Sequence, residues 1–145
     1  MALYSSIFYA GKLEHRQRPQ QFGLLGFFEA QGLGDPVLMH HVVGMEQQDP
    51  GNASLYNTAE VLAVQRYVVD LLQSSSFGLE PQDICVITPY TRQVQALERQ
   101  FESLGAAFAG VECGTVERFQ GQERRVVIIS AVRCSRAGSR AQGDA

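Results

Sequence analysis

The stretch Ile84-Cys85-Val86-Ile87-Thr88, directly before Pro89, decides the fold class of this 145-residue chain. Its first four residues are all apolar, without the polar alternation of a half-exposed strand, which is typical of a strand buried on both faces. Such strands occur in parallel sheets that helices cover. The stretch therefore favours an α/β sheet over an antiparallel one.

The segments on either side alternate between helical and extended patterns. Asn57 and Glu60 have the spacing of a helix N-cap and its reciprocal partner, and apolar residues at helical spacing behind them predict a helix over 57–73. A second predicted helix, ended by Gly105, is marked by apolar residues between positions 94 and 104. Further strands are expected over 37–43, 111–116 and 126–132, with loops over 44–53 and 74–81. This order predicts an α/β fold with a mainly parallel sheet flanked by helices.

Composition and charge narrow the possible functions. Hydrophobic residues make up 45% and charged residues 19% of the chain, which excludes a disordered class. The formal net charge of −3 means that any contact with nucleic acid has to be local. No apolar run reaches the roughly 20 residues of a membrane span, and three widely spaced cysteines fit a reducing compartment. We expect an intracellular protein, cytoplasmic or nuclear, with no membrane association.

The lysine content excludes one enzyme class. Lys12 is the only lysine and stands in Gly11-Lys12-Leu13, whereas a phosphate-binding P-loop needs Gly-Lys followed by Ser or Thr. No Asp-Glu pair ends an apolar strand to hold magnesium. A self-contained nucleoside triphosphatase of the P-loop class is therefore ruled out.

Ligands of parallel sheets bind beyond the carboxyl ends of the strands, where this chain carries polar loops. The loop over 117–125 contains Gln120, Gly121 and Glu123. A glycine among carboxylate and amide side chains allows a nucleotide to approach closely and to be hydrogen-bonded. The alternative is a charged, solvated turn between two strands.

A second polar cluster, Tyr90, Arg92 and Gln93, lies at a strand-to-helix junction. An aromatic ring can stack on a base, and a guanidinium near a helix N-terminus can bind phosphate. The alternative is a helix start introduced by proline, with Tyr90 as a packing residue.

Other motifs of catalytic or metal sites are incomplete. His40 and His41 are expected inside the first strand with no further ligand at metal spacing, so no metal site is predicted. No CxxC and no Gly-x-Ser-x-Gly motif occurs. The chain has no complete catalytic constellation of its own.

Four stretches nevertheless carry a specific resemblance. Residues 54–60, 87–94, 114–124 (Gly-Thr-Val-Glu-Arg-Phe-Gln-Gly-Gln-Glu-Arg) and 127–133 follow one another in this order. Together they resemble the second RecA-like domain of superfamily 1 helicases, in the branch that includes the nonsense-mediated-decay helicase. The segment 7–13 is similar to the start of that domain, so the resemblance covers roughly residues 5–133.

The resemblance implies a RecA-like, P-loop NTPase-type domain that lacks its own P-loop. It divides the chain into a helix or loop lead-in over 1–34, an incomplete helicase C-terminal domain over 35–133 and a disordered tail over 134–145. In this family ATP binds with Mg²⁺ between two RecA-like domains, and the absent first domain mainly holds the Mg²⁺. Single-stranded RNA or DNA lies across both domains.

The resemblance also implies roles for ten residues. The nucleotide would contact Tyr90, Arg92, Gln93, Gln120, Gly121 and Glu123, and the nucleic-acid backbone would contact Thr88, Thr115, Ser130 and Arg133. Two departures concern the site. Thr91 follows the tyrosine, where many relatives have a basic residue, and residues 134–145 do not contain the family's next arginine motif.

The expected function is therefore that of the second motor domain of an ATP-dependent helicase, acting as a monomer with single-stranded RNA or DNA and the first RecA-like domain as partners. By itself the chain is expected to hydrolyse no ATP. The alternative is a catalytically inactive helicase-derived interaction module or truncated isoform. An unrelated α/β nucleotide-binding domain is a third possibility.

Overall fold

The structure is a computed structural model that describes residues 37–74 and 77–133. The chain divides into two units, Met1–Leu38 and Met39–Ala145, and every helix and strand named below belongs to the second. The predicted lead-in over 1–34 and the predicted tail over 134–145 lie outside the described residues. The proposed domain boundaries therefore stay predictions.

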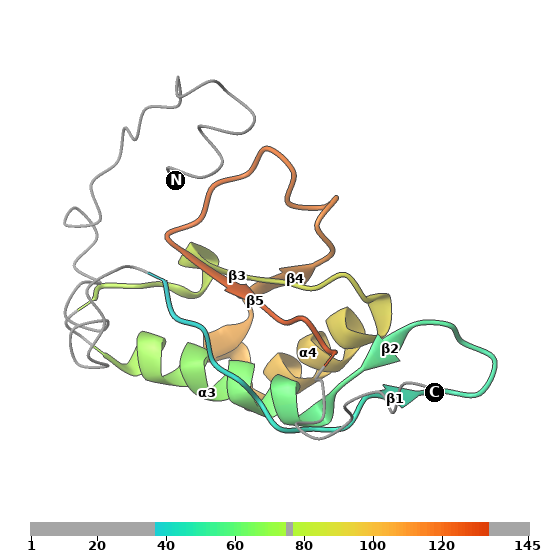
Figure 1. Cartoon of the computed structure of the whole chain (residues 1–145). Helices are drawn as coiled ribbons and strands as arrows, with labels where there is room; N and C mark the ends of the chain where they lie inside the picture. Colours follow the sequence, from blue (N-terminus) through green and yellow to red (C-terminus); the bar gives the residue numbers. More distant parts are fainter. Residues whose placement is uncertain (1–36, 75–76, 134–145) are drawn as a thin grey trace, which may run out of the picture. The chain divides into compact units, whose positions relative to one another are not determined.

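A three-stranded parallel sheet forms the centre of the fold (Figure 1). Its strands are β3 (Ile84–Ile87), β4 (Glu112–Gly114) and β5 (Val126–Ile129), in the order β4-β3-β5. Val86 lies opposite Cys113 on one side and Ile128 on the other. The first three residues of β3 are buried, as its apolar sequence predicts. The α/β class with a mainly parallel sheet is confirmed.

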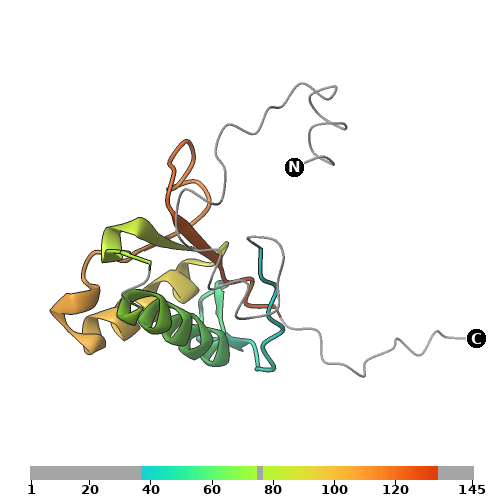
Figure 2. The ribbon, with the colours of Figure 1, turned by 90° about the vertical axis from the view of Figure 1, so that its left-hand side faces the viewer.

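Two long helices pack on one face of this sheet, α3 (Thr58–Gln73) and α4 (Thr91–Leu104), while the segment 115–125 arches over the other face (Figures 1 and 2). Short 3₁₀ turns, η2 (Pro81–Asp83) and η3 (Ala106–Phe108), precede β3 and β4. Asn57 caps α3 by accepting hydrogen bonds from the N–H groups of Ala59 and Glu60. Gly105 ends α4 at φ 94, a conformation that glycine adopts without strain.

The core is built from the apolar faces of these elements. Fully buried apolar side chains come from both helices, from the central strand and from the segment after β5, namely Val68 of α3, Leu97 of α4, Ile84 and Val86 of β3, and Val132. Burying a side chain of this size stabilises the fold by about 1.5–3 kcal/mol. The core thus joins both helices to the central strand.

The predicted first strand is wrong. Residues 37–43 have no regular structure and place Val37, Met39 and Val43 on the surface. His40 and His41 are exposed rather than inside a strand, and the His40 Nδ1 lies 2.9 Å from the Tyr67 hydroxyl. An apolar run forms a strand only when another strand pairs with it, and no described strand does.

The predicted loop over 44–53 is also partly wrong. It contains β1 (Gln47–Gln48), which pairs antiparallel with β2 (Leu55–Tyr56) in a small separate sheet. The strands predicted over 111–116 and 126–132 are shorter, because a turn begins at Val116 and residues 130–133 have no regular structure. The hairpin matters for the site because it packs against α4.

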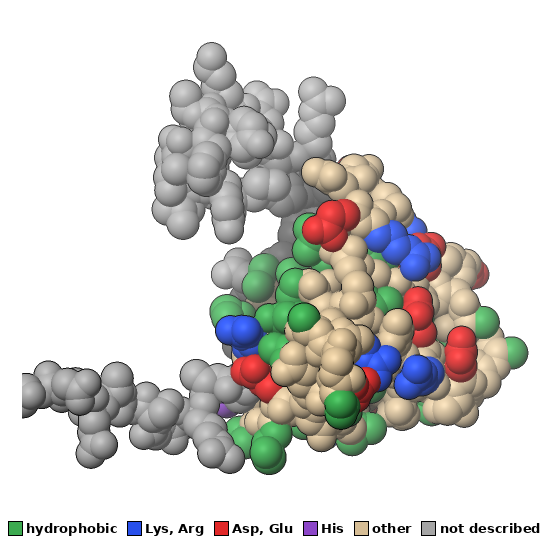
Figure 3. Space-filling view, turned by 90° about the vertical axis from the view of Figure 1, so that its right-hand side faces the viewer, with side chains coloured by type: hydrophobic (Ala, Val, Ile, Leu, Met, Phe, Trp, Pro, Cys, Tyr) green, Lys and Arg blue, Asp and Glu red, His purple; other side chains and the backbone are tan. Residues whose placement is uncertain are grey.

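The surface carries mixed charges. In the face shown in Figure 3, acidic and basic side chains are interspersed and no broad area of one sign is visible. Within the described ranges, no helix is both long and apolar enough to cross a bilayer.

Candidate functional site

The carboxyl ends of the three parallel strands bring three predicted residues to one edge of the sheet. Thr88, Thr115 and Ser130 directly follow β3, β4 and β5. Backbone hydrogen bonds extend the ladder there, from the Thr88 N–H to Gly114 O (3.1 Å) and from the Ser130 N–H to Ile87 O (2.9 Å). Thr88 and Ser130 are buried, whereas Thr115 is half-buried. Of these three hydroxyl groups, that of Thr115 is the one near solvent.

A direct contact joins Tyr90 and Arg133 at the same edge. The Arg133 Nε donates a hydrogen bond of 3.0 Å to the Tyr90 hydroxyl, across 43 positions of sequence. Arg133 is exposed and Tyr90 half-buried. The structure therefore combines an aromatic ring with a solvent-accessible guanidinium, one predicted for the nucleotide and the other for nucleic acid.

Arg92 is held by the β1–β2 hairpin. Its guanidinium forms an ion pair with Asp49, donates to the Gln95 Oε1 at 2.6 Å and lies 6.0 Å from the centre of the Tyr56 ring. Its buried Nε has no hydrogen-bond acceptor among the described residues. The Arg92 backbone N–H donates to the Ser54 Oγ (3.1 Å), so the hairpin supplies the side-chain cap that Tyr90 does not give to α4.

Gln93 points into the protein, not toward solvent. Its side chain is 0% exposed; its Oε1 accepts from the Asn57 N–H at 2.9 Å and its Nε2 donates to the Ser130 Oγ at 2.9 Å. The Ser130 hydroxyl in turn donates to the Glu60 Oε2 at 2.6 Å. We call Asn57, Glu60, Gln93 and Ser130, with the backbone of Val132, the polar clamp. Gln93 and Ser130 thus lie behind the surface that a ligand could touch.

The other predicted nucleotide residues lie in the 115–125 loop. Gln120, Gly121 and Glu123 are all exposed, and Gly121 has φ 78 with no atom within 4 Å of the place where a Cβ would stand. The loop is fastened by its arginines: Arg118 donates to Cys113 O (3.1 Å) and Arg124 pairs with Glu112 (3.0 Å). The glycine conformation and the open space beside it fit a loop that a ligand approaches closely.

Hydrogen bonds join some of the ten predicted residues to one another. Hydrogen bonds connect Tyr90 with Arg133 and Gln93 with Ser130, and a weak one of 3.5 Å runs from the Tyr90 N–H to the Thr88 hydroxyl. In the part of the chain that the structure describes, no hydrogen bond or ion pair joins this group to Gln120, Gly121 or Glu123. The sheet edge and the exposed loop therefore contribute to the candidate site without a direct polar contact between these described residues.

Three titratable side chains near the central strands and this loop have shifted pKa values. Burial raises the pKa of the Cys113 thiol to about 12 and also raises the pKa of Cys85, so burial favours the protonated, less nucleophilic form of both thiols. A hydrogen bond from Thr115 lowers the pKa of the exposed Glu117. Among residues 37–74 and 77–133, no three His, Cys, Asp or Glu side chains gather as metal ligands would.

Sequence reasoning missed three members of the site. Asn57 was expected only as a helix cap, Glu60 as its reciprocal partner, and Asp49 as part of a loop. The Glu60 carboxylate binds Ser130 and the Val132 N–H (2.9 Å) instead of the Asn57 backbone. The spacing from Asn57 to Glu60 identified both residues, but their partners lie too far away in the sequence for any local pattern to reveal.

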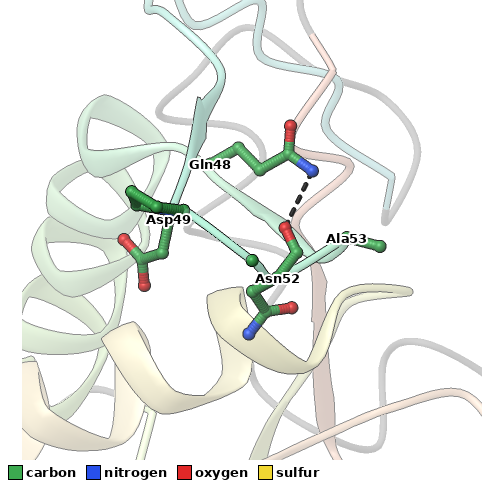
Figure 4. Close-up of a pocket in the computed structure, with 6 residues that line it drawn as sticks. Gln48, Asp49, Asn52 and Ala53 are labelled. Carbon is green, nitrogen blue, oxygen red and sulfur yellow. Dashed lines mark hydrogen bonds between the residues drawn. The ribbon is translucent and has the colours of Figure 1, made fainter.

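An open depression lies at the turn of the β1–β2 hairpin, lined by six consecutive residues from Gln48 to Ala53 (Figure 4). The Gln48 Nε2 donates to Asn52 O at 2.8 Å across it, while Asp49 points away from that pair. None of the ten predicted site residues lines it. Asp49, the ion-pair partner of Arg92, does line it, so the depression adjoins the candidate site through this one residue.

One protein family matches nearly the whole chain. The model of a family described as "AAA domain" matches residues 1–143. The RNA helicase Mov10l1 of Mus musculus is 36% identical over 134 residues, covering 92% of this chain and 11% of the relative, and its Homo sapiens counterpart is 37% identical with the same coverage. The 3'-5' exoribonuclease HELZ2 of Homo sapiens is 36% identical over 104 residues, which are 68% of this chain and 4% of the relative.

The chain spans only about a tenth of the length of the helicases that it matches. The family match covers nearly all of the chain, and the parallel sheet with its helices agrees with a RecA-like fold. The chain therefore belongs to this AAA-domain family and is a superfamily 1 helicase domain of the branch that includes the nonsense-mediated-decay helicase.

Proposed function

We propose that this chain is the second motor domain of an ATP-dependent helicase, which helps to bind ATP in an inter-domain cleft and contacts the backbone of single-stranded RNA or DNA. The observation that carries the proposal is the hydrogen bond from Arg133 to Tyr90, at the edge where all three parallel strands end. It joins a residue suited to nucleic-acid phosphates with one suited to a nucleotide. Ligands of parallel sheets bind at this edge.

The residues present fit a nucleotide. Tyr90 offers a ring for stacking, and the Arg92 Nε is a buried donor that lacks a described acceptor. Gly121 and Glu123 offer open space and a carboxylate on the exposed loop, with Gln120 beside them. Gln93 acts from behind by holding Asn57 and Ser130. ATP would supply the free energy for movement along the strand, and a first RecA-like domain would hold most of the Mg²⁺ coordination.

Nucleic acid would be held through phosphates. Arg133 is exposed and Thr115 half-buried at the sheet edge, and such donors fix position on the backbone without reading bases. The interspersed charges and the net charge of −3 give no long-range attraction. Binding by this chain should therefore be weak and salt-sensitive. The names of the Mov10l1 relatives favour RNA over DNA.

The alternative is a helicase-derived module that binds a protein partner. It is favoured by exposed apolar side chains on β5, since Val127 is 50% and Ile129 73% exposed. Such side chains on a strand are suited to a protein contact. Under this alternative the chain would not bind single strands.

The test measures binding of a fluorescent 15-residue oligouridylate to the 145-residue chain by anisotropy, at 50 and 200 mM salt. We expect Arg133→Ala to weaken binding severalfold and to reduce the salt slope by about one. The matched control is Arg99→Ala, which removes an exposed arginine that lies on α4, not at the sheet edge. This variant should bind as the unchanged chain does. No binding at 50 mM salt, or equal loss in both variants, would overturn the proposal.

A further inference from the structure

Val132 has a backbone conformation that its residue type rarely adopts. Its φ is +68, and it is the one non-glycine residue with positive φ in the described ranges. The Arg133 N–H donates to Ala131 O at 2.7 Å, so Val132 is the central residue of a three-residue γ-turn. That turn with positive φ is the strained form, and a β-branched side chain makes it worse. Such a strained turn persists only when contacts with the surrounding residues stabilise it.

Two side chains from the start of α3 hold both polar groups of Val132. The Glu60 Oε2 accepts from its N–H at 2.9 Å, and the Asn57 Nδ2 donates to its carbonyl oxygen at 3.1 Å. Both Asn57 and Val132 are 0% exposed, so water does not compete for these bonds. The helix start thus fixes a peptide segment 72 to 75 positions away in sequence.

The rest of the polar clamp supports the same turn. Glu60 shares its Oε2 between the Val132 N–H and the Ser130 hydroxyl, and Gln93 joins Ser130 to the Asn57 N–H. The turn is followed at once by Arg133, whose Nε reaches Tyr90. The conformation at Val132 therefore decides where Arg133 points.

We propose that Asn57 and Glu60 are positioning residues, which hold Val132 in the strained turn and thereby keep Arg133 against Tyr90. Without either of them the strain is no longer offset, so the turn relaxes to negative φ and Arg133 leaves the tyrosine. The effect on ligand binding rests on the function proposed above. The positioning of Arg133 by Asn57 and Glu60 does not depend on that function. Two experiments separate them.

The first experiment tests the strain by comparing Val132→Gly with Val132→Ala in urea unfolding of the 145-residue chain. Both variants lose the buried side chain, but only glycine adopts positive φ freely. We expect the unfolding equilibrium constant of the glycine variant to be about fivefold smaller than that of the alanine variant. A more stable alanine variant would overturn the strained turn, because alanine is the favoured residue at negative φ.

The second experiment tests the positioning with the NMR signal of the Arg133 Nε–H, assigned by its loss in Arg133→Ala. Asn57→Ser keeps a helix-capping oxygen but removes the donor to Val132. We expect it to shift the signal and to speed its exchange with solvent, and we expect the same of Tyr90→Phe, which removes the acceptor hydroxyl. The matched control is Thr58→Ala, at the next position, which loses only a hydrogen bond to the exposed Gln47 and should leave the signal unchanged. An unchanged signal in Asn57→Ser would overturn the proposal.

Oligouridylate binding tests whether the positioning of Arg133 matters for the proposed function. Asn57→Ser should weaken binding severalfold, and the double variant with Arg133→Ala should bind no worse than Arg133→Ala alone, because both changes remove the same contact. Additive losses would show that Asn57 acts by another route and would overturn the link. If the unchanged chain binds no oligouridylate, the proposed function fails while the NMR signal still decides on the positioning.

Discussion

Replacement of Gln93 by alanine distinguishes a buried framework residue from a ligand contact. Gln93 lies on α4 and is completely buried. Its side chain accepts from the Asn57 N–H and donates to the Ser130 Oγ, each at 2.9 Å, with a longer bond of 3.4 Å to Asn57 O. Alanine removes all three bonds and leaves the Asn57 N–H buried without an acceptor.

The geometry gives the size of the loss. A buried donor without a partner costs about 1–3 kcal/mol, and the lost bond to Ser130 adds about 1 kcal/mol. The free energy of unfolding should therefore fall by about 3 kcal/mol. For a domain of this size, that corresponds to a fall in Tm of roughly 10–20 °C.

The assay is thermal and urea unfolding of the 145-residue chain, followed by circular dichroism. Gln95→Ala is the matched control, because it makes the same substitution two residues later at an exposed position of α4 and loses only the exposed hydrogen bond from Arg92. About 0.5 kcal/mol or less is expected there. If Gln93→Ala lost less than about 1 kcal/mol and matched Gln95→Ala, Gln93 would not link Asn57 to Ser130 inside the protein. A side chain turned outward toward a nucleotide would then be the better account.

Two further predictions concern the loop and the thiols. Gly121 has φ 78 and open space around it, so Gly121→Ala should lower the free energy of unfolding by about 1 kcal/mol through backbone strain alone; an unchanged urea midpoint would contradict this. Because burial raises the pKa of Cys113 to about 12, the fold keeps a proton that the unfolded chain releases above about pH 8.5. The free energy of unfolding should therefore fall as pH rises past that value. At pH 8, Cys113 should react with a thiol reagent only when the chain unfolds. Rapid reaction in native buffer would refute its burial.

Local patterns were sufficient for the elements that form the core. The apolar run from Ile84 to Ile87 predicted a buried strand, and the apolar spacing behind Asn57 predicted α3, because each depends on residues close in sequence. The run over 37–43 has similar composition, yet it forms no strand. Strand formation depends on a pairing partner, which composition does not reveal.

The candidate site was predictable by resemblance but not in its internal arrangement. Gln93 and Ser130 carry amide and hydroxyl groups that look suited to a ligand, yet the structure uses them inside the protein. Glu60 finds its partners 70 and 72 positions away. Such long-range pairings arise when the helices pack on the sheet, so no spacing rule along the chain could reveal them.

Strand β5 bonds to β3 alone among the described strands, which leaves its other edge without a described partner, and Ile129 is nearly three-quarters exposed. Unpaired backbone groups along an apolar strand recruit strands from other molecules. During synthesis, two nascent copies can pair along such an edge before folding is complete. A chaperone that binds this edge until the chain has folded would prevent such pairing.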